Sequence, residues 1–334
     1  MQPFQYSRPS TVDQAVVAGS RSKTAQQYAD VRFIAGGTTL VDLMKLDVEH
    51  PDQVVDINAL PLAQVRPAPG GGLVIGALAR NSTVAHHATV QRDYPVLSQA
   101  LLSGASPQLR NMATTAGNLL QRTRCVYFRD TAHACNKRQP GTGCSAIGGH
   151  NRMLAILGTS RDCIASNPSD QNVALTALEA TIQVQGANGT RTIPIHEFYL
   201  QPGSTPNREN VLEPGDLVVS VTLPAPLAGS QSHYLKLRDR AAYEFALASA
   251  AIVVKLNGSR IEYARVALGG VGTIPWRSRE AEHVLQGHVA NAATFHRAAE
   301  AALKDARPAS ENGFKVELAK RCIVRALTTT TQAA

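Results

Sequence analysis

The stretch "VRFIAGGTTLVDLMKL", residues 31–46, combines the signals of a strand, a tight turn and a helix. Residues 31–34 predict a short buried strand that runs into paired glycines, Gly36 and Gly37. The apolar residues that follow recur at helical spacing, with Thr38 or Thr39 as the N-cap. Because "QVVDI" at 53–57 predicts the next strand, we expect a small α/β unit here.

The paired glycines allow backbone amides to approach a ligand closely, and a helix that begins beside them would favour a phosphate group. The turn is neither a GxGxxG fingerprint nor a P-loop, however, and paired glycines more often mark an ordinary turn. "TTAGN" at 114–118 and "NPSD" at 167–170 are equally weak signals by themselves, and an aspartate beside a helix start can simply belong to a capping box. Lys236 lies on a predicted strand, where an exposed lysine is the ordinary interpretation.

The remaining sequence predicts two domains joined by a short linker. We expect the first domain at 1–224, a linker at 225–231 and a C-terminal α+β domain at 232–334. The first domain is expected to contain two hairpins, at 65–77 and 181–195, helices at 81–87, 94–105 and 169–180, and a strand that Pro224 ends. The second is expected to contain strands at 233–238, 246–258 and 260–270, then helices at 278–287, 291–304 and 311–328.

Four of the five cysteines lie in residues 119–165, a region with little secondary-structure pattern. A structureless stretch of this length needs something to organise it, and a bound metal group would do so. The cysteines are Cys125, Cys135, Cys144 and Cys163. No CxxC pair occurs, which disfavours a zinc ribbon, whereas an iron-sulfur cluster tolerates irregular spacing of four thiolates.

Other residues of this region bear on the same prediction. His133 and His150 could each replace a cysteine ligand, although lone histidines are more often surface residues. Cys322, at helical spacing among apolar residues, is expected in the core. Positive charge around the cysteines is expected to stabilise thiolates and raise the potential of a cluster. It comes from Arg122, Arg124, Arg129, Lys137, Arg138, Arg152 and Arg161.

The net charge of +8 permits binding to nucleic acid or to an acidic protein. The basic residues lack the interleaved aromatic side chains of a single-strand binding groove, so we expect no nucleic-acid binding. No apolar run approaches the length that spans a bilayer, and the first residues lack the order of a signal peptide. We therefore expect a soluble protein without a membrane partner or an export signal of its own.

Taken together, the segments resemble the FAD-binding subunit of the xanthine dehydrogenase and aldehyde oxidase family of molybdenum hydroxylases. The matching segments run in order over nearly the whole chain. They are "FQYSRPSTVDQAV", "FIAGGTTLVDLMK", "VVDINAL", "TTAGN", "PSD", "VVSVTLP" and "YLKLRDRAAYEFALASAA". The resemblance implies a two-subdomain FAD-binding fold of the vanillyl-alcohol-oxidase type, followed by the C-terminal α+β domain.

The resemblance also implies which residues bind FAD. Residues 33–40 would wrap the pyrophosphate, Thr114 would supply a hydroxyl, Gly117 and Asn118 a close-approach turn, and Asp170 a carboxylate. Val218 and Lys236 match two further flavin-lining positions. The pyrophosphate loop comprises Phe33, Ile34, Ala35, Gly36, Gly37, Thr38, Thr39 and Leu40.

One departure from the family pattern concerns the path from Asn118 to Asp170, which covers fifty-two positions here and far fewer in ordinary members. The additional residues, about 119–165, hold the four cysteines. Two branches of the family carry such an inserted 4Fe-4S loop: three-subunit bacterial aldehyde oxidoreductases and 4-hydroxybenzoyl-CoA reductases. The run "LLQRTRCVYFRDTAHACNKRQPGTGC" is more similar to the aldehyde-oxidising branch.

The resemblance implies an electron-transfer subunit of a molybdenum aldehyde oxidoreductase, which oxidises aldehydes to carboxylates. A large partner would hold molybdopterin, and a small partner with 2Fe-2S clusters would pass electrons to FAD here and on to an acceptor. No residue of this chain is predicted to act as acid, base or nucleophile. The alternatives are a 4-hydroxybenzoyl-CoA reductase subunit and, from another class, a zinc-stapled nucleic-acid-binding module. The expected location is the periplasm, by co-export with a partner, or the cytoplasm.

Overall fold

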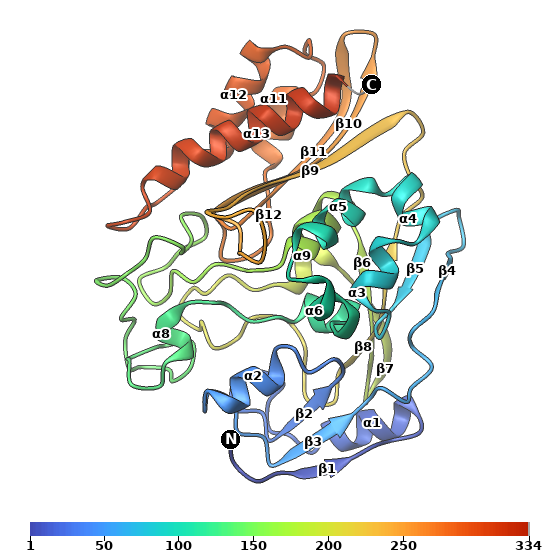
Figure 1. The fold of residues 1–334 in the computed structure, drawn as a ribbon, viewed down its shortest axis with the longest axis vertical. Helices are drawn as coiled ribbons and strands as arrows, with labels where there is room; N and C mark the ends of the chain where they lie inside the picture. The colour runs from blue at the N-terminus through green and yellow to red at the C-terminus, as the bar shows by residue number, and fades with distance from the viewer. Residues whose placement is uncertain (333–334) are drawn as a thin grey trace.

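The computed structural model describes residues 1–332. The first subdomain, called the N-terminal part below, contains a three-stranded parallel sheet with strand order β1-β3-β2 (Figure 1). Its elements are β1 (Gln5–Ser7), α1 (Val12–Gly19), β2 (Val31–Ile34), α2 (Leu40–Lys45) and β3 (Gln53–Asp56). The hydroxyl of Thr11 caps α1 by accepting from the backbone N–H of Gln14. The prediction of a small α/β unit over residues 31–57 is confirmed.

The second subdomain is a five-stranded antiparallel sheet in the order β4-β5-β8-β6-β7. Both predicted hairpins are present, and the second turns at Gly189, whose φ of 100° suits glycine. The strands are β4 (Val65–Pro67), β5 (Leu73–Gly76), β6 (Thr181–Gly186), β7 (Gly189–Pro194) and β8 (Leu217–Leu223). Proline follows β8 directly, as predicted, because it cannot donate to the ladder.

Seven short helices belong to the same subdomain, and all of them except α6 contribute buried side chains to its apolar core. They are α3 (Asn81–Ala85), α4 (Ala88–Asp93), α5 (Pro95–Ser103), α6 (Pro107–Met112), α7 (Thr115–Leu119), α9 (Asp170–Ala177) and α10 (Ile195–Phe198). Ser106 caps α6 and Thr114 caps α7, each accepting from a backbone N–H three residues on. The loop between α6 and α7 therefore has a defined shape.

The C-terminal part is an antiparallel sheet in the order β12-β11-β10-β9, with three helices along one face (Figure 1). Its elements are β9 (Ser230–Leu237), β10 (Ala248–Asn257), β11 (Arg260–Gly269), β12 (Trp276–Arg277), α11 (Arg279–Leu285), α12 (Ala292–Leu303) and α13 (Phe314–Gln332). The predicted α+β fold class is confirmed. Strand β9 begins inside the residues expected to form the linker, and residues 333–334 of the predicted domain lie outside the described residues.

Both faces of this sheet are covered, which explains the nearly continuous burial of β10. Helices α11–α13 cover one face, and α5 and α9 of the second subdomain pack against the other. The two parts of the chain therefore meet through a helix-on-sheet contact. No helix within residues 1–332 is both long and apolar enough to cross a membrane.

The cysteine segment, residues 119–165, forms a lobe of mainly irregular structure beside α2 (Figure 1). Beyond the last residue of α7 it contains one short helix, α8 (Val126–Arg129), as its weak pattern predicts. The segment has its own small apolar core around Phe128, to which Leu43 and Val48 contribute from the N-terminal part. Ala309 packs against the same core from the C-terminal part, so the lobe contacts both ends of the chain.

Candidate functional site

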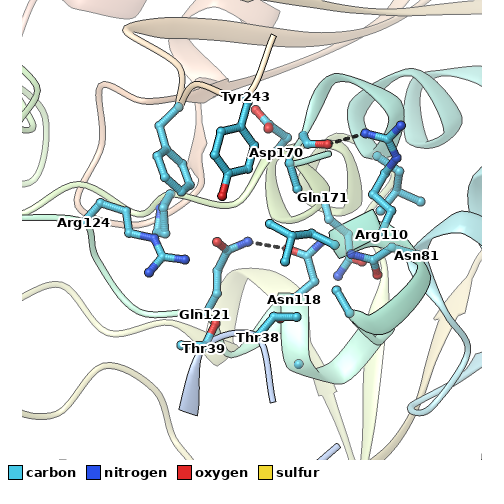
Figure 2. A pocket seen from close by; sticks show the side chains of 18 of the residues that line it. Thr38, Thr39, Asn81, Arg110, Asn118, Gln121, Arg124, Asp170, Gln171 and Tyr243 are labelled. Carbon is cyan, nitrogen blue, oxygen red and sulfur yellow. Dashed lines mark hydrogen bonds between the residues drawn. The ribbon is translucent and has the colours of Figure 1, made fainter. Parts of the chain in front are cut away.

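A cavity of about 520 Å³ lies between the second subdomain and the C-terminal part. Figure 2 shows Arg124, Gln121 and Tyr243 on one side of it, and Asn118, Gln171 and Arg110 on the other. Thr38 and Thr39 lie at its lower end in that view. The residues of the wall thus come from segments far apart in the chain, including the loop after β2, α6, α7, the cysteine segment and the loop after β9.

Asp170 and Lys236, both predicted at the site, form a buried ion pair on the wall of this larger cavity. Lys236 Nζ donates to Asp170 Oδ2 at 2.8 Å, and the Tyr234 hydroxyl donates to Oδ1 at 2.5 Å. The lysine side chain is only 3% exposed, so its interpretation as an exposed lysine is wrong. Burial, and then the Asp170 charge, raise the pKa of Tyr234 well above its ordinary value. The helix cap beside Asp170 is Ser169.

A smaller cavity of about 210 Å³ adjoins the larger one, since Thr38, Thr39 and Gly117 line both. All eight residues of the predicted loop at 33–40 line this smaller cavity, together with Thr114 and Val218. Asn118, Asp170 and Lys236 line the larger cavity. The structure therefore brings every predicted cofactor-binding residue to one of two connected hollows.

The two glycines of the loop serve different needs. Gly37 has a φ of 73°, a conformation that favours glycine, whereas Gly36 does not have a positive φ. A Cβ on Gly36 would lie 2.0 Å from the carbonyl oxygen of Met112, so this position needs glycine for close approach of two backbones. Thr39 is the N-cap of α2 but makes no side-chain cap, so its hydroxyl is not committed to the helix.

Thr114 and Asn118 hold the turn around Gly117, which lines both cavities. Thr114 is 1% exposed, and its Oγ1 accepts from the backbone N–H of Gly117 at 3.2 Å. The Asn118 Oδ1 accepts from Gln121 Nε2 and from Ser169 Oγ. These bonds orient the turn and leave the Asn118 amide group as a donor towards the larger cavity.

All four predicted cysteine ligands line one small cavity in the core of their lobe. Cys125, Cys135 and Cys163 are buried, and Cys144 is partly buried. Cys135 and Cys144 lie side by side through an isolated β-bridge. Burial raises the pKa of the Cys125 thiol to about 12, and burial also raises the pKa values of Cys144 and Cys163.

Backbone N–H groups donate to three of the four sulfurs, as they do where thiolates are ligands. Cys125 accepts from Tyr127 and Phe128. The Ala165 N–H donates to Cys163 Sγ at 3.5 Å. Cys144 accepts from the two residues that follow Ser145. Polar donors therefore surround sulfurs whose pKa values burial raises.

The segment between Cys135 and Cys144 is held by specific hydrogen bonds. The Asn136 side-chain oxygen accepts from the N–H groups of Gly141 and Gly143 at 3.1 and 2.8 Å. The Arg138 guanidinium donates to the carbonyl oxygens of Tyr127 and Phe128, each at 2.8 Å. These bonds bring the two halves of the lobe together.

Of the seven basic residues expected to stabilise the thiolates, Lys137 lines the cysteine cavity. Its charge lowers the pKa of Cys163 against the larger effect of burial. The other basic groups point elsewhere. Arg124 and Arg129 pair with Asp42, and Arg152 with Asp239. Arg122 pairs with Glu49 and Glu209, Arg138 donates to backbone carbonyls, and Arg161 is 92% exposed. Arg122, Arg124 and Arg129, whose side chains are largely buried, have carboxylate partners because an unpaired buried charge is costly.

The two histidines of the region and the fifth cysteine lie away from the cysteine cavity. His133 and His150 do not line the cysteine cavity, and the His150 side chain is 89% exposed. Cys322 is a core residue of α13, as predicted. Within residues 1–332, no group of three or more His, Cys, Asp or Glu side chains is placed to hold a single metal ion.

Several wall residues of the larger cavity escaped sequence reasoning, above all Arg124, Arg110 and Tyr243. Arg124 attracts notice in the sequence only as a neighbour of Cys125. No local signal indicates that its side chain leaves the cysteine lobe and reaches another cavity. The loop that carries Tyr243 was recognisable by resemblance, but its inward side chains were not.

Two family models match the chain. The "FAD binding domain in molybdopterin dehydrogenase" matches residues 2–226, and the "CO dehydrogenase flavoprotein C-terminal domain" matches residues 233–330. The chain is 48% identical to the aldehyde oxidoreductase FAD-binding subunit PaoB of Escherichia coli. The alignment extends over 329 residues and covers 98% of each chain.

More distant relatives extend the same pattern. The carbon monoxide dehydrogenase medium chain of Hydrogenophaga pseudoflava is 27% identical over 329 residues, covering 97% of this chain and 96% of that protein. A solved structure of carbon monoxide dehydrogenase from the same organism matches with a TM-score of 0.77 and 26% identity, over 99% of each chain. The fold and the sequence therefore agree along the full length.

Proposed function

Because this chain belongs to the FAD-binding medium subunits of the molybdenum hydroxylase family, which are oxidoreductase components, we propose that it is the electron-transfer flavoprotein subunit of an aldehyde oxidoreductase. The observation that carries the aldehyde assignment is the 48% identity to an aldehyde oxidoreductase subunit over 98% of both chains. Two features of the structure support cofactor binding: the connected cavities and the four gathered cysteines.

FAD would lie across the two connected cavities. The smaller cavity, with its glycine loop, suits the ADP half, because backbone N–H groups near Gly36 and Gly37 can approach a pyrophosphate. The larger cavity suits the isoalloxazine, because Tyr243 and Phe245 supply apolar ring surface and Asp170 and Lys236 a paired polar edge. When bound, FAD supplies the electron-accepting chemistry, and the protein orients it and sets the surrounding charge.

Gly36→Ala is expected to weaken FAD binding by at least about tenfold, equivalent to about 1.4 kcal/mol. The added Cβ would meet the Met112 carbonyl oxygen at 2.0 Å and force the loop away from α6. FAD per chain, measured by absorbance after purification and gel filtration, checks this. Gly313→Ala is the matched control, because no heavy atom lies within 4 Å of its added Cβ. Equal FAD content in both variants would contradict the prediction.

The four cysteines would hold a 4Fe-4S cluster. Their chemistry fits, since four sulfurs line one cavity and backbone N–H groups donate to three of them. A cluster places irons and sulfides between its thiolates, so its ligands lie farther apart than those of one metal ion. The four cysteines fit this requirement, because they line one cavity. They are not close enough together to form a site for a single metal ion. When bound, the cluster carries single electrons and ties the lobe together.

The partners would be a large molybdopterin-binding subunit, which oxidises the aldehyde, and a small 2Fe-2S subunit, which delivers electrons to this chain. Support comes from the full-length match to medium chains and FAD-binding subunits of multi-subunit dehydrogenases. In this arrangement the chain binds FAD and releases electrons to an acceptor, and it contributes no acid, base or nucleophile to aldehyde oxidation.

An absorption spectrum of the anaerobically purified complex tests the proposal, with flavin, iron, zinc and acid-labile sulfide quantified on the same sample. We expect flavin bands over a broad iron-sulfur shoulder. For the subunit purified by itself, we expect about one FAD and about four irons per chain. A folded subunit with one zinc and no flavin would overturn both assignments.

Cys135→Ser is expected to remove the cluster's share of iron and sulfide, because it deletes one of the four cysteines that line the cavity of the lobe. Metal analysis of the complex measures this, and Cys322→Ser serves as the control, since Cys322 lies in the core of the C-terminal part. If FAD and both partners stay bound, the rate of FAD reduction by aldehyde separates two roles. An unchanged rate would exclude a relay through the cluster, and unchanged iron content would contradict the ligand assignment.

A further inference from the structure

Two arginines of the cysteine segment, Arg124 and Arg129, line the larger cavity rather than the cavity of the cysteines. Arg124 directly precedes Cys125, and Arg129 ends α8. Figure 2 shows the Arg124 side chain extending into the hollow opposite Asn118. One short piece of chain thus contributes a sulfur to one cavity and a guanidinium to the other.

The charge of this arginine pair is only half neutralised. Both guanidiniums share one carboxylate: Arg129 Nη2 donates to Asp42 Oδ2 at 2.5 Å, and Arg124 Nη1 donates to the same oxygen at 3.3 Å. Two donors are buried without a partner among the described residues, namely Arg124 Nε and Arg129 Nη1. By contrast, Lys236 and Asp170 on the same wall neutralise each other. A net positive charge therefore remains at this end of the cavity.

The position of Arg124 is restrained on two sides. Its guanidinium carbon lies 5.2 Å from the centre of the Phe245 ring, in the range of a cation–π contact. Its backbone is held by the neighbouring cysteine, whose sulfur accepts from two N–H groups of α8. A side chain restrained in this way keeps its charge in one place instead of moving into solvent.

We propose that the cysteine segment stabilises the reduced flavin through the positive charge of Arg124. The inference rests on the proposed function, with the isoalloxazine in the larger cavity. Reduction adds two electrons, delivered by iron-sulfur clusters of the partner, and one proton from water at N5. One net negative charge then remains on the ring, and the uncompensated positive charge of the Arg124 and Arg129 pair attracts it. The reduction potential of FAD thus depends on where the cysteine segment holds the Arg124 guanidinium.

The test is a redox titration of the flavin in the purified complex, with dithionite and mediator dyes, followed by flavin absorbance. Arg124→Gln is expected to lower the ratio of reduced to oxidised FAD at a fixed ambient potential by about tenfold. For a two-electron couple that is about 30 mV. Arg124→Lys should recover most of the ratio. Asp42→Asn should shift it in the opposite direction, because it leaves both guanidiniums without their carboxylate.

Arg161→Gln is the matched control from the same segment, since its side chain is 92% exposed, and it should leave the ratio unchanged. If Arg124→Gln binds FAD with an unchanged potential, the inference is wrong. If that variant loses FAD, the titration is made on Arg129→Gln, for which the same downward shift supports the inference and an unchanged ratio overturns it. Absence of FAD from the wild-type complex would instead refute the proposed function.

Discussion

Arg122→Met is expected to lower the free energy of unfolding by about 3–5 kcal/mol, the usual cost of removing one partner from a buried ion pair. The Arg122 side chain is 11% exposed and bridges two carboxylates, Glu49 and Glu209. Its guanidinium also lies 4.6 Å from the centre of the Phe128 ring, in the core of the cysteine lobe. The substitution therefore removes the link between the lobe, the N-terminal part and the loop before β8.

The two carboxylates keep other partners, which is why the expected loss is not larger. Glu49 still accepts from Arg32 at 2.9 Å, and Glu209 still pairs with Lys137 at 3.0 Å. Denaturant unfolding followed by circular dichroism measures the effect. Arg161→Met, at an exposed position of the same segment, is the control. Equal stability of the two variants would contradict a structural role for the Arg122 network.

The same network predicts a pH dependence. Burial alone would raise the pKa of Glu209, but the charges of Arg122 and Lys137 outweigh burial and lower the pKa from 4.5 to about 2. The folded-state pKa is thus below the unfolded one, so this contribution is complete above pH 4.5 and is lost as the pH falls towards about 2. Arg122→Met removes one of the two charges that lower the pKa of Glu209. As the pH falls from 4.5 to about 2, the free energy of unfolding should therefore decrease less in Arg122→Met than in the wild type.

Lys315→Met is expected to abolish a rise in stability that the wild-type protein shows above neutral pH. Lys315 is 0% exposed, and no carboxylate pairs with its Nζ among the described residues. The Nζ instead donates to three backbone carbonyls: those of Met153, Leu154 and Gly270, at 3.2, 2.9 and 2.6 Å. The lysine therefore joins residues 153–154 of the cysteine segment to the end of β11 in the C-terminal sheet.

Burial, and then the charge of Arg152, lower the pKa of Lys315 from 10.5 to about 7. Between these values the unfolded chain binds more protons than the folded one, so the free energy of unfolding rises with pH. The contribution is up to about 1.4 kcal/mol per pH unit. It should appear as a widening difference between wild type and Lys315→Met from pH 7 upwards.

Unfolding curves collected from pH 6.5 to about 9.5 measure this difference, and Lys304→Met, at an exposed position after α12, is the control. The control should follow the wild-type pH dependence. If Lys315→Met also runs parallel to wild type, Lys315 is not responsible for the rise, and its role is confined to the three hydrogen bonds.

Much of the fold was readable from local pattern. Residues 31–34, the hairpin at Gly189 and the helix that buries Cys322 carry their periodicity and turn residues within a few positions of the chain. The weak pattern of residues 119–165 likewise indicated irregular structure, and the spacing of its four cysteines pointed to one shared site. The structure gathers those cysteines around one cavity.

The environment of Lys236 and the direction of Arg124 depended instead on the tertiary structure. Lys236 is buried because α5 packs on β9 and Asp170, at the start of α9, pairs with its Nζ. The same Nζ donates to the Ser103 carbonyl, 133 positions away in the sequence. Arg124 points away from the cysteines because Asp42 of α2 and Phe245 of the C-terminal part lie on the other side. Local sequence determines which backbone shape a segment prefers, because that preference comes from neighbouring residues. Which charges end up buried and paired depends on contacts between distant segments, and these exist only once the three parts of the chain have packed together.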